Sequence, residues 1–181
     1  MSLEKSIREC FITALKDEQK EKKHKGLLVI KLNRKEAEEY LTKAKKNLEL
    51  CKLFGAKGFD YKLPEEWFYV LYYCALAILT KFGVESRSQR CTALFLKYVK
   101  EKRLIVYKDE FIERIMVHRY KEKKSDVDER EEARYSSSIK IIEIEKNYEK
   151  MMQLCGEALI QCEKIVFLDQ NLTLPKEIIE M

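Results

Sequence analysis

The feature that most constrains the fold is an uncharged, largely apolar segment, Trp67–Leu79, near the middle of the chain. Pro64–Glu66 precedes it and Gly83 follows it. Proline in the first turn, acidic side chains near the N-terminus and glycine just past the end are typical helix boundaries. A helix that is apolar on every side must be surrounded by protein. The segment is also shorter than the ~20 apolar residues that cross a bilayer, so we predict the central helix of a soluble bundle at 67–82.

The rest of the sequence predicts helices that cover this one. With only 5 glycines and 2 prolines in 181 residues, the chain has few turn signals, which disfavours a sheet of many hairpins. Apolar residues recur at helical spacing in the segments 3–15, 37–54, 91–99, 111–116 and 144–166. We therefore expect an all-α, up-and-down bundle of four to five helices with an N-terminal helical extension. The expected division is 1–32 for the N-terminal helix and charged linker, 33–168 for the bundle and 169–181 for a C-terminal tail.

Several local signals predict where the helices begin and end. Asn33 is expected to cap the helix that follows it, and Gly55 to end that helix. Ser86 and Gln89 have the spacing of a capping box before the third helix, and a fourth helix is predicted over residues 109–120. The apolar segment Leu27–Ile30 is compatible with either a short extended piece or packing against the bundle.

The number and spacing of the cysteines and histidines limit which metal sites and disulfides can be expected. None of the six cysteines forms a C-x-x-C pair, and with only two histidines a zinc site is not expected. Residues 1–19 form a charged amphipathic segment rather than a secretory leader. We therefore expect a cytoplasmic protein whose cysteines are core thiols rather than disulfides, with no metal, no cofactor and no membrane association.

A basic region in the middle of the chain supplies the first candidate site. The net charge of +5 permits a polyanionic ligand without requiring one. Residues 81–103 carry seven lysines and arginines against two glutamates. Within them, Arg87 and Arg90 flank Ser88 at the predicted start of a helix, where backbone N–H groups favour anions. The alternative is a helix cap with solvated charges.

A second candidate pair has the chemistry for RNA cleavage. Arg114 and His118 share a helix face at i,i+4 spacing. An imidazole can transfer a proton near neutral pH, and a guanidinium can bind phosphate. The alternative is an exposed histidine on a basic helix.

A third candidate cluster lies in the polar segment that precedes the last helix. Arg130 and Arg134 could hold a phosphate together, and Tyr135 could stack on a base. The alternative is that both arginines pair with neighbouring glutamates. Glycine-rich nucleotide loops are absent, as are the G-x-S-x-G and H-E-x-x-H motifs.

The order of these segments resembles the HEPN family (higher eukaryotes and prokaryotes nucleotide-binding domain). The resemblance rests on EAEEYLTKAKKNLELCKLF, WFYVLYYCALAILTKFGVESRSQRCTALF and DEREEARYSSS, followed by a long amphipathic helix. It covers approximately residues 34–166. It implies a helical bundle that is usually a homodimer, and either a metal-independent RNase or the partner of a minimal nucleotidyltransferase. Nuclease members have four to six residues between arginine and histidine, whereas three separate Arg114 from His118. The resemblance is therefore to the branch with arginine and tyrosine, represented by Arg130, Arg134 and Tyr135.

The leading functional hypothesis is a nucleotide- or RNA-binding helical module, with a nucleotidyltransferase as a possible protein partner. One alternative is a metal-independent endoribonuclease of the toxin or defence type that uses His118 to transfer a proton and Arg114 or Arg130 to hold phosphate. The other is a non-catalytic protein whose role is structural dimerisation.

Overall fold

The structure is a computed structural model of the 181-residue chain, and it describes residues 2–116, 141–170, 172–175 and 178. The elements follow the order α1 (Leu3–Gln19), β1 (Leu27–Val29), α2 (Arg34–Ala56), the 3-10 turn η1 (Asp60–Lys62), α3 (Leu63–Lys81), β2 (Val84–Ser86), α4 (Gln89–Glu101), α5 (Asp109–Ile115) and α7 (Ile141–Val166). The predicted all-α helical bundle is confirmed. None of the helices in the described ranges combines the length and apolar character that a bilayer crossing requires.

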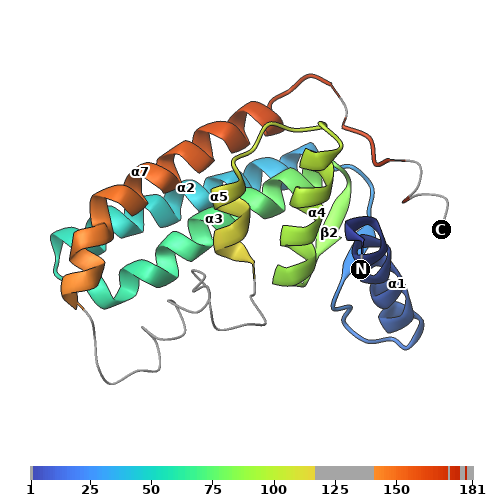
Figure 1. Ribbon diagram of the computed structural model, residues 1–181, viewed down its shortest axis with the longest axis horizontal. Helices are drawn as coiled ribbons and strands as arrows, with labels where there is room; N and C mark the ends of the chain where they lie inside the picture. Colours follow the sequence, from blue (N-terminus) through green and yellow to red (C-terminus); the bar gives the residue numbers. More distant parts are fainter. Residues whose placement is uncertain (1, 117–140, 171, 176–177, 179–181) are drawn as a thin grey trace.

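The helix α3 is the centre of the bundle. It packs against α2 and α7, which run alongside it, and against α4 and α5 (Figure 1). Most of its residues are buried, from Leu63 and Trp67 to Lys81. The prediction of a surrounded central helix is therefore confirmed, with a start at Leu63. The chain leaves α3 through Gly83, whose φ of 70° lies in the left-handed region that glycine adopts without strain.

Both ends of α2 have a clear physical cause. Asn33 caps the helix as predicted, because its side-chain oxygen accepts a hydrogen bond from the Glu36 N–H at 3.2 Å. Gly55 does not end the helix, so that prediction is wrong; α2 continues to Ala56. A Cβ at Gly55 would lie 2.9 Å from Cε2 of Tyr148, so glycine is needed here for the close approach of α7.

The start of α4 also differs from the prediction. Ser88 is the N-cap, and its hydroxyl accepts a hydrogen bond from the Cys91 N–H at 3.3 Å. Ser86 is instead the last residue of β2, so the expected capping box at Ser86 is wrong. The predicted fourth helix begins at Asp109 as α5, but it ends at Ile115 because Met116 has an extended backbone, so the predicted range of 109–120 is too long; residues 117–120 lie outside the described residues.

The N-terminal residues form an arm, defined here as α1 with the following segment to β1. The strand β1 pairs antiparallel with β2, with Leu28 opposite Glu85. The segment Leu27–Ile30 is therefore extended, and it also packs on the core through the buried Leu27 and Leu28. The helix α1 packs mainly on α4 and β1, and it lies at one end of the bundle (Figure 1).

One cysteine prediction is wrong. Cys10 of α1 and Cys91 of α4 form a disulfide, with their Cα atoms 5.9 Å apart. These residues are 81 positions apart in the sequence, and only the packing of α1 on α4 brings them together. The remaining four cysteines are free and buried, as expected: Cys51, Cys74, Cys155 and Cys162.

Candidate anion-binding site at the start of α4

The structure describes some of the predicted site residues. Arg87 and Arg90 lie at the β2–α4 junction, and Arg114 lies on α5. The others lie outside the described residues: His118, Arg130, Arg134 and Tyr135. Their proposed roles therefore stay predictions.

Arg87 is exposed and is held at the junction by two contacts. Its backbone N–H donates to the carbonyl oxygen of Gly26 at 3.2 Å, so the N-terminal arm fixes its main chain. Its Nε donates to Oε1 of Glu85 at 2.6 Å, and both side chains are partly exposed to solvent. The guanidinium is therefore oriented by a carboxylate, and an anionic ligand would compete with that carboxylate for it.

Glu85 also binds a buried histidine that the sequence did not single out. His24 is 4% exposed, and its Nε2 lies 3.2 Å from the same Glu85 oxygen. The Gly26 N–H donates to Nδ1 of His24 at 3.4 Å, which assigns the proton of a neutral ring to Nε2. Both ring nitrogens are thus used within the protein, and His24 positions Glu85 rather than serving as a proton shuttle.

The environment of Glu85 favours its charged form. Burial raises the pKa of this carboxyl, but hydrogen bonds from Arg87 and His24 outweigh burial and hold the pKa below its ordinary value. No local pattern in the sequence marks this group, because His24 and Glu85 are 61 positions apart.

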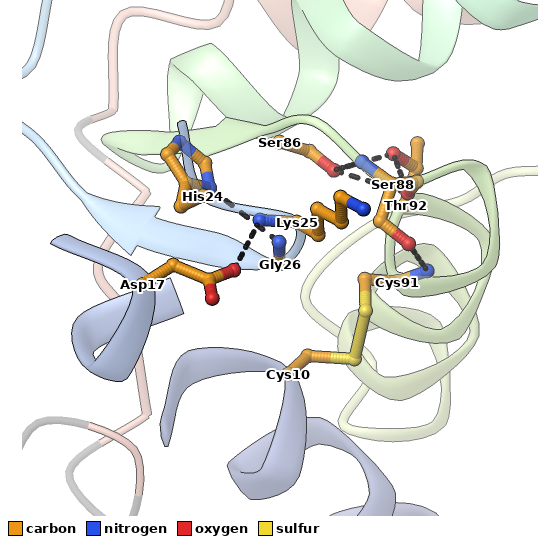
Figure 2. The surroundings of a disulfide bond; sticks show 9 residues. All are labelled: Cys10, Asp17, His24, Lys25, Gly26, Ser86, Ser88, Cys91 and Thr92. Carbon is orange, nitrogen blue, oxygen red and sulfur yellow. Dashed lines mark hydrogen bonds between the residues drawn. A yellow bond between two sulfur atoms is a disulfide. The ribbon is translucent and has the colours of Figure 1, made fainter. Parts of the chain in front are cut away.

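Arg90 and the hydroxyl groups complete the junction. Arg90 is half-buried in the first turn of α4 and has no ion pair among the described residues. The Ser88 N–H donates to Oγ of Ser86 at 3.3 Å, and the Thr92 hydroxyl lies 2.8 Å from that same oxygen (Figure 2). These contacts fix the first turn of α4 and, with it, the position of Arg90.

A cluster of tyrosines lies on α2 and α3. The rings of Tyr40 on α2 and Tyr73 on α3 stack at 6.3 Å between centroids, and Tyr73 stacks in turn on Tyr69. Nζ of Lys43 lies 5.1 Å from the Tyr40 ring centroid and 5.8 Å from that of Tyr73. Burial raises the pKa of Tyr40, and the negative charges of Glu36 and Glu85 raise it further.

Sequence reasoning missed this cluster although a signal was present. Tyr69 and Tyr73 recur at i,i+4 on a helix that is otherwise almost entirely apolar. Their half-buried positions mark the one side of α3 that retains polar groups. Tyr40 and Lys43 join them only because α2 packs antiparallel beside α3.

Arg114 makes an ion pair within its own helix. Its Nη2 lies 3.5 Å from Oε1 of Glu110, one turn earlier on α5, and its side chain is 22% exposed. The cleavage hypothesis therefore receives no support from the described half of the Arg114–His118 pair. No group of three histidine, cysteine or acidic side chains suited to a metal ion occurs in the described part of the chain.

Comparison of the chain with protein-family models and with curated proteins gave no match.

Proposed function

We propose that the protein binds nucleotides or RNA through what we call the Arg–Tyr face. This face consists of Arg87 and Arg90 at the start of α4 and of Tyr40, Lys43 and Tyr73 on α2 and α3. Guanidinium and ammonium groups bind phosphate, and aromatic rings bind unstacked bases. The observation that carries the proposal is the placement of Lys43 over the stacked Tyr40 and Tyr73 rings.

The charge distribution on this face supports an anionic ligand. Neither Arg90 nor Lys43 has a carboxylate partner among the described residues. Arg87 is paired with Glu85, so its guanidinium can bind a phosphate only if the Glu85 carboxylate is displaced. The all-helical bundle is also the architecture that the resemblance to the HEPN family implies.

The proposal is tested by titrating labelled single-stranded RNA into the full-length protein at a series of salt concentrations. We expect binding that weakens as salt rises, because bound phosphates release counterions. Arg90→Ala and Lys43→Ala should each weaken binding and flatten the salt dependence by about one phosphate contact.

The matched control is Lys52→Ala, which removes the same charge as Lys43→Ala. Lys52 is exposed on α2 nine residues further on, on the opposite side of the helix from Lys43. An equal loss of RNA binding in the two lysine variants would mean that net charge alone accounts for the effect. Absence of salt-sensitive binding in the unmodified protein would refute the proposed function.

We further propose a homodimer, with a nucleotidyltransferase as a candidate partner. These proposals rest on the family resemblance. Light scattering on the purified protein tests the first of them, and we expect twice the chain mass of 21.6 kDa. The mass of a single chain at micromolar concentration would contradict it.

A further inference from the structure

The disulfide lies where the N-terminal arm meets the bundle. Cys10 is in the middle of α1 and Cys91 is in the first turn of α4, so the bond joins two helices that otherwise only pack together (Figure 2). Cys162 lies against Cys74, and its Sγ is 3.4 Å from the Cys74 carbonyl oxygen, yet both are free thiols. Disulfide formation among the described cysteines is therefore confined to the contact between the arm and α4.

Few hydrogen bonds attach the arm to the bundle, although Ile7 and Phe11 of α1 are buried in the shared core. The β1–β2 ladder spans three residue pairs. Arg87 and Gly26 share one backbone hydrogen bond, and His24 contacts Glu85. All of these act on the segment after α1. The helix α1 itself is held by side-chain packing and by the disulfide, and its outer residues Ile12 and Leu15 are exposed.

We propose that Cys10–Cys91 is a redox-controlled clasp that locks α1 onto the bundle when oxidised and releases it when reduced. The reaction partner is a dithiol reductant. One thiolate of the dithiol attacks a sulfur of the disulfide and forms a mixed disulfide, releasing a protein thiolate. The second thiolate of the dithiol then attacks the mixed disulfide and releases the other protein thiolate. Two electrons pass to the protein, both cysteines take up a proton, and the reductant leaves as its own disulfide.

Burial couples this exchange to motion of α1. Cys10 is 2% exposed and Cys91 is 4% exposed, so an attacking thiolate cannot reach either sulfur while α1 is seated. Reduction therefore follows a local opening of the arm, and the absence of the bond afterwards keeps the opened state accessible. Cys91 follows Arg90 directly, so the clasp also fixes the start of α4. This consequence for ligand binding rests on the proposed function, whereas release of α1 does not.

Hydrogen exchange read by mass spectrometry tests the clasp on the full-length protein. The oxidised protein and the same protein treated with dithiothreitol are compared, and thiols are counted after denaturation. We expect four free thiols before reduction and all six afterwards. On reduction, exchange in α1 should become at least tenfold faster, and in the reduced protein α1 should exchange faster than α3.

Two variants separate the clasp from other effects of reduction. Cys10→Ser with Cys91→Ser should exchange like the reduced protein in the presence or absence of dithiothreitol. Cys51→Ala removes a buried thiol that is outside the disulfide, and it should keep the difference between the oxidised and reduced states.

The proposal fails if six thiols are counted and α1 exchanges as slowly as before, since the bond would then be a passive cross-link. It also fails if the two new thiols appear only under conditions that unfold α3. Because the reduced form of the natural protein is measured directly, poor folding of the double variant would not affect the result. Loss of RNA binding without faster exchange in α1 would count against the clasp, and release of α1 with no effect on RNA would count against the Arg–Tyr face.

Discussion

At the residue scale, glycine is required at position 26 because the segment that follows α1 passes very close to the backbone of α1. A Cβ at this position would lie 2.1 Å from the backbone oxygen of Cys10, an atom that cannot move without displacing α1. We expect Gly26→Ala to destabilise the protein by about 2 kcal/mol or more, as overpacking against backbone does. Urea denaturation followed by circular dichroism measures the change.

Gly156 provides the matched control for that substitution. It lies inside α7, and nothing lies within 4 Å of the place that a Cβ would occupy. Gly156→Ala should therefore stabilise the protein by about 0.5 to 1 kcal/mol, because alanine loses less backbone entropy in a helix. Opposite signs for the two alanine substitutions are the expected outcome, and equal signs would contradict the packing at Gly26.

Glu85 should make stability depend on pH in the acid range. Its pKa is lower in the folded protein than its ordinary value, since the contacts with Arg87 and His24 outweigh burial. Its contribution is therefore present at neutral pH and is lost as pH falls past the ordinary carboxyl pKa and through the lower folded-state pKa. We expect Glu85→Gln to be less stable than the natural sequence at pH 7, by a difference that shrinks in acid.

Thermal unfolding at a series of pH values measures this difference. Glu49→Gln is the control, because Glu49 is exposed on α2 and has no ion pair among the described residues. A stability difference for Glu85→Gln that stays constant down to pH 3 would show that the carboxylate charge is not the cause.

At the element scale, α3 should dominate the stability of the bundle. Leu79 is fully buried on α3, whereas Leu53 of α2 is 50% exposed. Leu79→Ala should cost about 2 to 5 kcal/mol, through lost burial and the cavity that remains. Leu53→Ala removes the same atoms and should change the free energy of unfolding by about 0.5 kcal/mol or less. Similar losses for both variants in urea denaturation would contradict the central placement of α3.

At the scale of the whole molecule, the disulfide constrains the unfolded chain. It joins positions 81 residues apart, and closure of a loop of that length corresponds to about 4 kcal/mol in the chain-entropy treatment. We expect the reduced protein to unfold at a lower urea concentration, with a free energy of unfolding that is lower by about 4 kcal/mol. Urea titrations with and without a reductant measure the shift, and coincident curves would show that the bond adds no stability.

The sequence by itself determined most of the helical architecture. An uncharged segment must be buried, and striped neighbours must cover it, so α3 and the apolar faces of α1, α2, α4 and α7 could be predicted from spacing alone. The placement of Arg87 and Arg90 at a helix start could also be predicted, because a helix start and its basic residues are adjacent in the chain. The cap at Asn33 is local in the same sense.

Only the tertiary structure decided which distant residues meet. The disulfide, the contact of His24 with Glu85 and the placement of Lys43 over Tyr73 each join residues from separate elements. Gly55 was misjudged for the same reason, since the neighbour that excludes a side chain there lies on α7. Periodicity encodes which face of a helix is buried, but it carries no information on the partner helix or the register at which the two faces pack.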